Sequence, residues 1–540
     1  GNLRLPTSAG DVALTWSSSD PGVITATGDV TRPAVGGAAA SVTLTVTARK
    51  GDASASRELV ATVPPLPAAE DPFGYVMVHF VEDPNGYKEK VYLSLSRGED
   101  PTKWTRLNGG EPILSSDQGT TGVRDPYLVR SPEGDKFYLV ATDLRVFGGD
   151  NAGWGEWSRR GSRSLLVWES TDLVTWSDSR LVEVAPPTAG MAWAPEVVYD
   201  DTTGEYVVFW ASTLFAESDT AHTGPTYSRI LYAKTRDFVT FTPAQVLIDT
   251  GGDTIDTTMI RSGDDVVRFS KDNGPADRDV YQEVGSGIFA DDFRTVQTNI
   301  GRAQYGSVEG PLVFKDNYAD QWYLYVDEYG SGPQGYRPFV TTDLESGSWT
   351  PVGGDFELPG QTKHGAVVPL RGSEWERLAG VRTTSVDAVS AETRVGVAPA
   401  LPDAVTVRLS DGTTQQRKVT WDAADVSRPG VVEVSGDVIG TDTAARATVT
   451  VTGAALTVTA QSRCVGSTAY VAVTAVNTGA ELVTITLSTS YGTKAVADVA
   501  PGARAYQSFN ARTTRIPAGT ASATTAGDTA PATYTAITCG

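Results

Sequence analysis

Apolar and aromatic residues recur along the middle of the chain in short runs of β-forming residues, and no segment of useful length has helical periodicity. Five segments share one form, a strand followed by an acidic turn and an aromatic residue: "VYLSLSRGEDPTKW", "LLVWESTDLVTW", "ILYAKTRDFVTF", "GIFADDFRTV" and "PFVTTDLESGSW". Their closing aromatics are spaced by 72, 65, 52 and 56 residues and are Trp104, Trp176, Phe241, Phe293 and Trp349. A repeat of this length that holds several strands indicates a repeating all-β architecture.

Each repeat contains further strands ahead of this segment. A long aromatic strand, such as "FYLVATDL" or "WYLYVDEY", is preceded in four of the five repeats by a shorter one: "RDPYLVR", "WAPEVVYD", "IDTTMIRS" and "VEGPLVFK". The first repeat lacks the short strand, and the surplus strand "HGAVVPL" after the fifth repeat could supply it. The pattern therefore predicts a five-bladed β-propeller over residues 71–380, closed by pairing the last strand with the first blade.

The flanking segments differ in composition, because they contain Val- and Thr-rich strands, turn signals and few aromatics. They predict Ig-like β-sandwiches at residues 1–66, 381–453 and 454–540, so the expected fold class is all-β, a propeller flanked by Ig-like sandwiches. The first is followed by a Pro-rich linker, "PPLPAAEDP". Cys464 and Cys539 bracket the last segment and are expected to form a disulfide, which indicates export, although two buried free thiols are the alternative.

The net charge of the chain limits the kinds of molecule that it is expected to bind. The chain has 44 Lys and Arg against 65 Asp and Glu, a formal net charge of -21, which argues against nucleic acid and anionic membrane surfaces as partners. No apolar run approaches the roughly 20 residues that span a bilayer. We therefore expect a monomeric secreted protein, or one attached to the cell surface, with no transmembrane segment.

The short strands carry the candidate chemistry at their leading ends. If they are the innermost strands, their leading residues converge at one end of the central channel: Asp125, Glu196, Asp256, Glu309 and His364. Strand interiors avoid Asp and Glu, yet an acidic residue is expected at one common register in four of these strands. Any one of these carboxylates alone would be a solvated turn residue. Several converging carboxylates suit glycoside hydrolysis, which needs one protonated acid, one ionised base and a neighbour that raises the acid's pKa.

The ordered set "VRDPYLV", "WAPEVVYD", "IDTTMI", "VEGPLVFK" and "KHGAVVPL" resembles the blade-leading motifs of glycoside hydrolase family 43, inverting enzymes built on five-bladed propellers. The resemblance implies that Asp125 is the general base, Asp256 the residue that orients the acid and modulates its pKa, and Glu309 the general acid. It also places His364 near the axis, where a structural ion, commonly calcium, is found in the family. No other cofactor is required.

Further residues are candidates for substrate binding. The resemblance implies that Trp193 and Glu196 form the pocket wall, and Arg124 precedes the proposed base. Trp154 and Trp157, in the loop "GGDNAGWGEW", would either stack on a sugar or pack beneath their own loop. His79 lies in a strand and would face either the channel or a core.

The resemblance implies a substrate among the α-L-arabinofuranosides or β-D-xylosides of plant polysaccharides or oligosaccharides, and we favour arabinofuranosidase activity. One alternative is a retaining fructan hydrolase of family 32, because "EDPNG" offers Asp83 as a nucleophile. Asp83 is only 42 residues from Asp125, however, and Pro-Asn-Gly suits a hairpin there. Another alternative is a propeller that binds glycans without cutting them.

Overall fold

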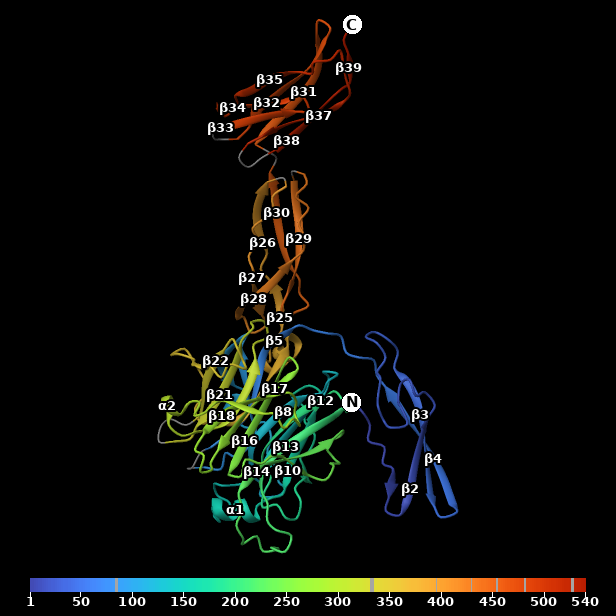
Figure 1. Cartoon of the computed structure of the whole chain (residues 1–540), viewed down its shortest axis with the longest axis vertical. Coiled ribbons are helices and arrows are strands. Elements are labelled where there is room, and N and C mark those ends of the chain that lie inside the picture. The colour runs from blue at the N-terminus through green and yellow to red at the C-terminus, as the bar shows by residue number, and fades with distance from the viewer. Residues whose placement is uncertain are drawn as a thin grey trace. The chain divides into compact units, whose positions relative to one another are not determined.

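The computed structural model describes residues 1–82, 86–330, 335–394, 396–428, 430–452, 455–479, 482–525 and 529–540. The chain divides into two compact units, Gly1–Arg382 and Thr383–Gly540. Strands dominate both units (Figure 1), as the sequence predicts. In the part of the chain that is described, no helix combines the length and apolar character needed to cross a membrane.

Five of the four-stranded antiparallel sheets in the first unit are the predicted blades. The first blade consists of β24 (Thr362–Arg371), β5 (Pro72–Val81), β6 (Tyr92–Arg97) and β7 (Asp100–Arg106). The second consists of β8 (Val123–Arg130), β9 (Phe137–Asp143), β10 (Ser164–Ser170) and β11 (Arg180–Glu183). The third consists of β12 (Trp193–Asp200), β13 (Glu205–Thr213), β14 (Ser228–Thr235) and β15 (Gln245–Ile248).

The remaining two blades follow the same plan. The fourth consists of β16 (Thr254–Ser262), β17 (Asp265–Asp272), β18 (Asp279–Gly285) and β19 (Arg294–Gln297). The fifth consists of β20 (Val308–Lys315), β21 (Trp322–Glu328), β22 (Gly335–Thr341) and β23 (Thr350–Pro351). Short helices lie outside the sheets: α1 (Trp154–Arg160), α2 (Arg302–Tyr305) and α3 (Gly372–Ala379).

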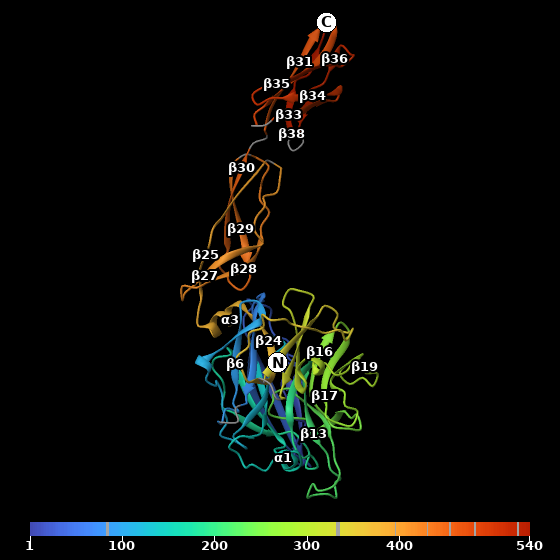
Figure 2. The same cartoon turned by 90° about the vertical axis from the view of Figure 1, so that its left-hand side faces the viewer.

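The ring closes as predicted. Strand β24 comes from the end of the propeller sequence and pairs antiparallel with β5, from Thr362 opposite Val81 to Arg371 opposite Pro72. The inner strands β8, β12, β16, β20 and β24 contact one another in this order, and β24 also contacts β8. Figure 1 labels β8, β12 and β16 within the body of the propeller, and Figure 2 places β24 there. The leading ends of the short strands therefore surround one axis.

The repeated acidic turn has a physical explanation. In the second blade, Asp172 Oδ1 accepts hydrogen bonds from the backbone N–H groups of Val174 and Thr175, at 2.9 and 2.6 Å. In the third blade Asp237 Oδ1 accepts the corresponding two bonds, at 2.9 and 2.8 Å. These Asx-type turns satisfy the backbone between the third and fourth strands, which is why an aspartate stands ahead of the closing aromatic in these two blades.

The N-terminal segment forms one antiparallel sheet in the order β1 (Ser8–Ala9), β2 (Val12–Ser18), β3 (Ala40–Lys50) and β4 (Ala53–Val63). Its core is small, because only four apolar side chains in it are fully buried: Ile24, Val42, Leu44 and Val63.

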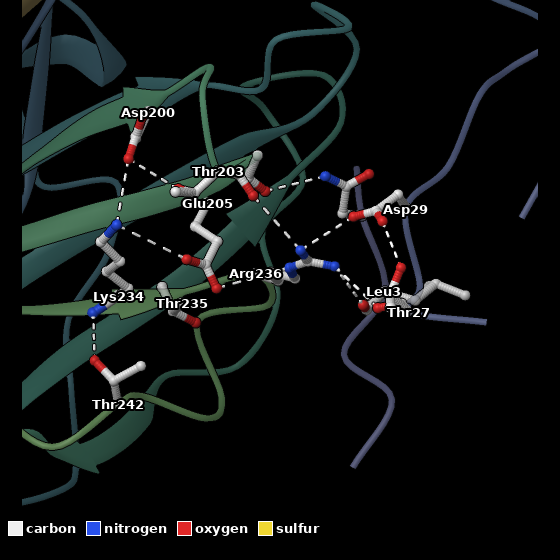
Figure 3. Close-up of polar contacts among 12 residues, drawn as sticks. Leu3, Thr27, Asp29, Asp200, Thr203, Glu205, Lys234, Thr235, Arg236 and Thr242 are labelled. Carbon is white, nitrogen blue, oxygen red and sulfur yellow. Dashed lines mark hydrogen bonds and ion pairs between the residues drawn. The ribbon is translucent and has the colours of Figure 1, made fainter. Parts of the chain in front are cut away.

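Polar contacts hold this segment on the propeller (Figure 3). The Arg236 guanidinium donates to the carbonyls of Leu3 and Thr27, at 3.3 and 3.2 Å, and its Nη2 lies 3.1 Å from Asp29 Oδ1. Arg32 Nη1 lies 2.7 Å from Asp135 Oδ2 at a second point. Arginine suits both positions because its planar fork can donate several hydrogen bonds at once.

The second unit contains two successive β-structures. The first is a six-stranded sheet in the order β25 (Thr383–Val386), β27 (Ala404–Leu409), β28 (Thr414–Trp421), β29 (Gly430–Val438), β30 (Ala445–Thr452) and β26 (Val389–Arg394). The second has one sheet of β31 (Leu456–Val465), β32 (Thr468–Asn477) and β35 (Arg504–Asn510). Its other strands are β34 (Gly492–Val499), β33 (Val483–Thr489), β37 (Gly519–Thr524) and β38 (Thr529–Tyr534), with the short pair β36 (Arg515–Ile516) and β39 (Ile537–Thr538). The predicted disulfide between Cys464 and Cys539 is present.

Candidate active site

A β-bulge interrupts each inner strand near its leading end. The pairing register shifts between Arg124 and Tyr127 in β8, and at the corresponding place in β12, β16, β20 and β24. In the first four strands the bulged residue has a positive φ: Asp125 at 47°, Ala194 at 47°, Asp256 at 47° and Gly310 at 50°. A bulge leaves its residue unpaired and re-aims the side chain, so the bulges bring Asp125 and Asp256 to the axis.

The expected common register of the four carboxylates is wrong. The bulge position holds Asp125 and Asp256 in two strands, but in β12 it holds Ala194, and Glu196 stands two residues later. Glu196 therefore stands outside the register of Asp125 and Asp256, although its charge still acts on His364 and Asp256. It is only 2% exposed and does not line the cavity described below.

Glu309 reaches the site from a different register, one residue before the bulge at Gly310. A Cβ at position 310 would lie 2.8 Å from the His364 ring, and the positive φ already disfavours any residue with a side chain. Glycine at this position therefore allows the His364 ring to lie beside the strand that carries Glu309.

A cavity of about 610 Å³ opens over the leading ends of the inner strands. It brings together seven of the nine residues expected at the site: Asp125, Asp256, Glu309, His364, Trp193, Trp154 and Arg124. Glu196 and His79 are the two that do not line it. A neutral ligand of a few sugar rings fits a cavity of this size.

His79 belongs to the core, so its expected role in substrate binding is wrong. Its ring is fully buried, with Nδ1 3.1 Å from the Phe80 carbonyl and Nε2 2.9 Å from Ser94 Oγ, and it stacks on Tyr92. Burial lowers the pKa of His79 to about 3, with a smaller contribution from the Arg106 charge. A neutral imidazole with both nitrogens satisfied is a structural part of the first blade.

Asp125 is held ionised. Burial raises the pKa of its carboxyl, but the hydrogen bond and charge of His364, together with Arg124 and Thr142, outweigh burial and lower it. His364 Nδ1 lies 3.6 Å from Asp125 Oδ1, and Thr142 Oγ1 donates to Oδ2 at 2.9 Å. A carboxylate that stays charged can accept a proton from water.

Glu309 is held protonated. Burial is the largest cause that raises its pKa, to about 8, and the charges of Asp256 and Asp327 add to it against the opposing charges of Lys363 and Arg124. Burial likewise raises the pKa of Asp256, whose Oδ2 accepts the Gly310 N–H at 3.1 Å. Two carboxyl groups in one cavity thus have opposite protonation states near neutral pH, which is how an acid and a base are distinguished.

His364 faces carboxylates. Burial lowers its pKa, but Asp125, Asp256 and Glu196 outweigh burial and raise it to about 9, so the ring is a cation near neutral pH. Calcium takes six to eight oxygen ligands. Within the described ranges, no group of three or more His, Cys, Asp or Glu side chains is arranged to hold a metal ion. An axial calcium ion therefore stays a prediction, and no step below depends on it.

Two tryptophans form an aromatic wall. Trp154, 52% exposed at the start of α1, meets Trp193 edge to face at 5.9 Å, and the Arg124 guanidinium lies 5.6 Å from the Trp154 ring. Trp157 instead is buried under the loop, where its indole donates to Asp150 at 2.8 Å. Of these two residues, Trp154 can stack on a ligand, whereas Trp157 packs beneath its own loop.

Sequence reasoning missed three charged residues beside these groups, namely Glu82, Asp327 and Lys363. Glu82 and Asp327 line the cavity, and Lys363 lies within ion-pair distance of both. Each is a charge at or near the end of an otherwise apolar strand, a signal that could have been used. Asp83, the nucleophile of the fructan alternative, lies outside the described residues.

Comparison with protein families gives three matches. A model described as a probable glycosyl hydrolase domain, of the group related to family 43, matches residues 71–376, which is more than half of the chain. An atrophied bacterial Ig domain matches residues 1–66, and a bacterial Ig-like domain of group 4 matches residues 386–441.

Individual relatives are similar over different shares of the chain. A curated α-L-arabinofuranosidase from Bifidobacterium longum subsp. longum is 32% identical over 390 residues, 62% of this chain and 36% of the relative. The chain thus spans about a third of that relative's length. Among solved structures, a native arabinanase from Bacillus subtilis is 16% identical over 46% of this chain and 82% of its own, with a TM-score of 0.30. An α-L-arabinofuranosidase from Lactobacillus brevis is 13% identical over 58% and 93%, with a TM-score of 0.32.

Proposed function

Because the chain belongs to the glycosyl hydrolase family whose model matches residues 71–376, we propose that it is an inverting glycoside hydrolase that releases α-L-arabinofuranose from plant-type polysaccharides or oligosaccharides. The observation that carries the proposal is that two carboxyl groups in one cavity have opposite protonation states, with Asp125 ionised and Glu309 protonated. The choice of arabinofuranose is supported by the curated relative.

The proposed reaction is a single displacement. Asp125 takes a proton from a water molecule, whose oxygen attacks the anomeric carbon. Glu309 donates its proton to the glycosidic oxygen, and the C–O bond to the leaving group breaks. Asp256 raises the pKa of Glu309 through its charge, which keeps the acid loaded. Trp154 and Trp193 would bind the faces of the sugars on the cavity wall.

The proposal extends to the location of the protein and to two alternative functions. We infer a secreted protein, because the disulfide and the Ig-like domains suit an extracellular one. That it is a monomer stays a prediction. A β-D-xyloside is the second candidate substrate, and the candidate that only binds glycans is disfavoured because a binding protein has no use for a loaded acid opposite an ionised base.

The proposal is tested by hydrolysis of p-nitrophenyl α-L-arabinofuranoside and p-nitrophenyl β-D-xyloside by the whole chain. We expect kcat/KM to be about tenfold or more higher for the arabinofuranoside, a usual size for discrimination by a pocket. The reverse preference would move the assignment to a xylosidase. Binding of arabino-oligosaccharides without turnover would contradict the enzymatic proposal.

The pH dependence of kcat/KM should show a wide plateau. Because Asp125 must be ionised, activity should fall only at a pH below the usual carboxyl range near 4, where its lowered pKa lies. Because Glu309 must be protonated, activity should fall again as the pH rises through about 8. Initial rates at substrate concentrations well below KM, measured across this range, report both limbs, and an alkaline limb near pH 5 would contradict the assignment of the acid.

A further inference from the structure

Five charged side chains of alternating sign form a continuous row beside the cavity: Asp327, Lys363, Glu82, Arg124 and Glu89. Asp327, Glu82 and Arg124 line the cavity. Lys363 Nζ lies 3.1 Å from Asp327 Oδ1 and 3.5 Å from Glu82 Oε2. Arg124 Nη1 lies 3.7 Å from Glu82 Oε1 and 2.8 Å from Glu89 Oε1. We call these five residues the charge row.

Most of the charge row is buried, and the ion pairs within it do not by themselves account for the free-energy cost of this burial. The side chains of Asp327 and Lys363 are each 1% exposed, and that of Glu89 is 0% exposed. Removing paired charges from water costs about as much free energy as their attraction returns, so a buried ion pair is weak evidence of stabilisation. Charges kept in this way beside a cleft more often serve a functional site.

One end of the charge row lies beside Glu309. Asp327 on β21 is the direct cross-strand partner of Glu309 on β20, so two carboxyl groups stand opposite each other in the sheet. Asp327 is also fixed in place, since Oδ2 accepts the backbone N–H of His364 at 3.3 Å. Lys363, the residue before His364 on β24, places its ammonium group 3.1 Å from the other carboxylate oxygen of Asp327, Oδ1.

The other end of the row holds Arg124. Glu89 accepts from Arg124 Nη1 and also from the backbone N–H groups of Val146 and Phe147, at 2.9 and 3.1 Å to Oε2. Arg124 stacks over Phe80 at 4.5 Å and immediately precedes Asp125 in the chain. The row therefore connects the segment that carries the proposed base with the strand pair that carries the proposed acid.

We propose that the charge row is a positioning device in which Lys363 and Asp327 act in opposite directions on the proton that Glu309 holds. The inference rests on the proposed function, and it assigns a role to residues that do not themselves react. The charges that act most strongly on Glu309 come from Asp256 on β16, Asp327 on β21, Lys363 on β24 and Arg124 on β8. Lys363 favours the ionised form of Glu309, and Asp327 favours its protonated form. Together they keep Glu309 protonated without preventing the release of its proton.

The test is the alkaline limb of the kcat/KM profile in two variants. Lys363→Met removes a cation, so the limb should move to higher pH, by about one unit, the lower end of what a nearby charge produces. Asp327→Asn removes an anion and should move the limb to lower pH by a similar amount. The conservative variant Lys363→Arg should leave the limb near its original position, as should Lys315→Met, which removes an exposed lysine of β20.

Opposite shifts separate this proposal from a structural role, because loss of packing lowers activity at every pH and moves no limb. The double variant Lys363→Met/Asp327→Asn removes both charges and should return the limb toward that of the wild type. Limbs that shift in the same direction in both single variants, or that do not move in either, would overturn the proposal. If Lys363→Met does not fold, Asp327→Asn and the double variant still decide between these outcomes.

A second readout does not depend on turnover. In protein labelled with ¹³C at the glutamate side-chain carboxyl, the resonance missing from Glu309→Gln identifies Glu309, and its titration should show the same two opposite shifts. If those shifts occur in a protein that hydrolyses neither test glycoside, the charge row stands and the proposed function fails. If the wild type hydrolyses the arabinofuranoside and the titration of Glu309 is the same in every variant, the charge row fails alone.

Discussion

Glu309→Gln is expected to lower kcat/KM by about 10³-fold on an oligosaccharide, within the range that general acid catalysis contributes. The loss should be much smaller on a p-nitrophenyl glycoside, because p-nitrophenolate leaves without a proton, whereas a sugar alkoxide does not. The amide keeps the size and hydrogen-bonding shape of the side chain in this buried position. Parallel measurement of both substrates with one variant therefore isolates the proton donation.

Glu217→Gln is the matched control, because Glu217 is an exposed residue of the third blade and should leave both rates unchanged. Equal losses on the two substrates would indicate that Glu309 does something other than protonate the leaving oxygen. Full activity on the oligosaccharide would remove Glu309 from the mechanism.

Asp125→Asn is expected to lower kcat by about 10²- to 10⁴-fold on both kinds of substrate. Without its carboxylate, residue 125 cannot take the proton of the attacking water, and a better leaving group does not replace that step. Asparagine is the right substitution because Asp125 has a φ of 47°, and Asn tolerates this left-handed region better than most residues. Thr142 can still donate to the amide oxygen, so the bulge should keep its shape.

Asp264→Asn in an exposed turn provides the control for this second variant. A loss confined to the oligosaccharide would assign Asp125 to the leaving group instead of to water. Circular dichroism and thermal unfolding of each variant show whether the fold has survived, which separates loss of chemistry from loss of structure.

The architecture of the propeller could be predicted because it depends on local and repeated signals. Short runs of apolar and aromatic residues mark the strands, and the aspartate of the Asx-type turn recurs between the third and fourth strands of successive blades. The surplus strand that became β24 was visible as a short strand without a repeat of its own. The disulfide followed from the count of two cysteines in one segment.

The register of the site could not be predicted in the same way. A β-bulge changes which residue faces the axis, and comparing the carboxylates directly put Glu196 in the place of Asp125. Aligning the shared proline of "RDPYLV" and "WAPEVV" would have placed Ala194 there instead. Similarly, the side of the strand on which His79 lies depends on pairing with β6. Local patterns mark where strands begin, but they do not resolve one-residue shifts in pairing.

The charge row could not be predicted from the sequence, for a further reason. Its members come from positions between 82 and 363 in the chain, and each alone is an ordinary charged residue near the end of a strand. Only the closure of the ring, which places β24 beside β5 and β8, brings Lys363 to Glu82 and Asp327. Contacts between residues this far apart in sequence appear only once the ring is assembled.

The stereochemistry of the first-formed sugar tests the central claim most directly. Proton NMR during the first minutes of hydrolysis of p-nitrophenyl α-L-arabinofuranoside, by the wild type and by Glu217→Gln, shows the anomeric signal before mutarotation. The account predicts that β-L-arabinofuranose appears first, because water attacks from the side of Asp125 opposite the leaving group. First appearance of the α-anomer would mean retention through a covalent intermediate, and would contradict the roles assigned to Asp125 and Glu309.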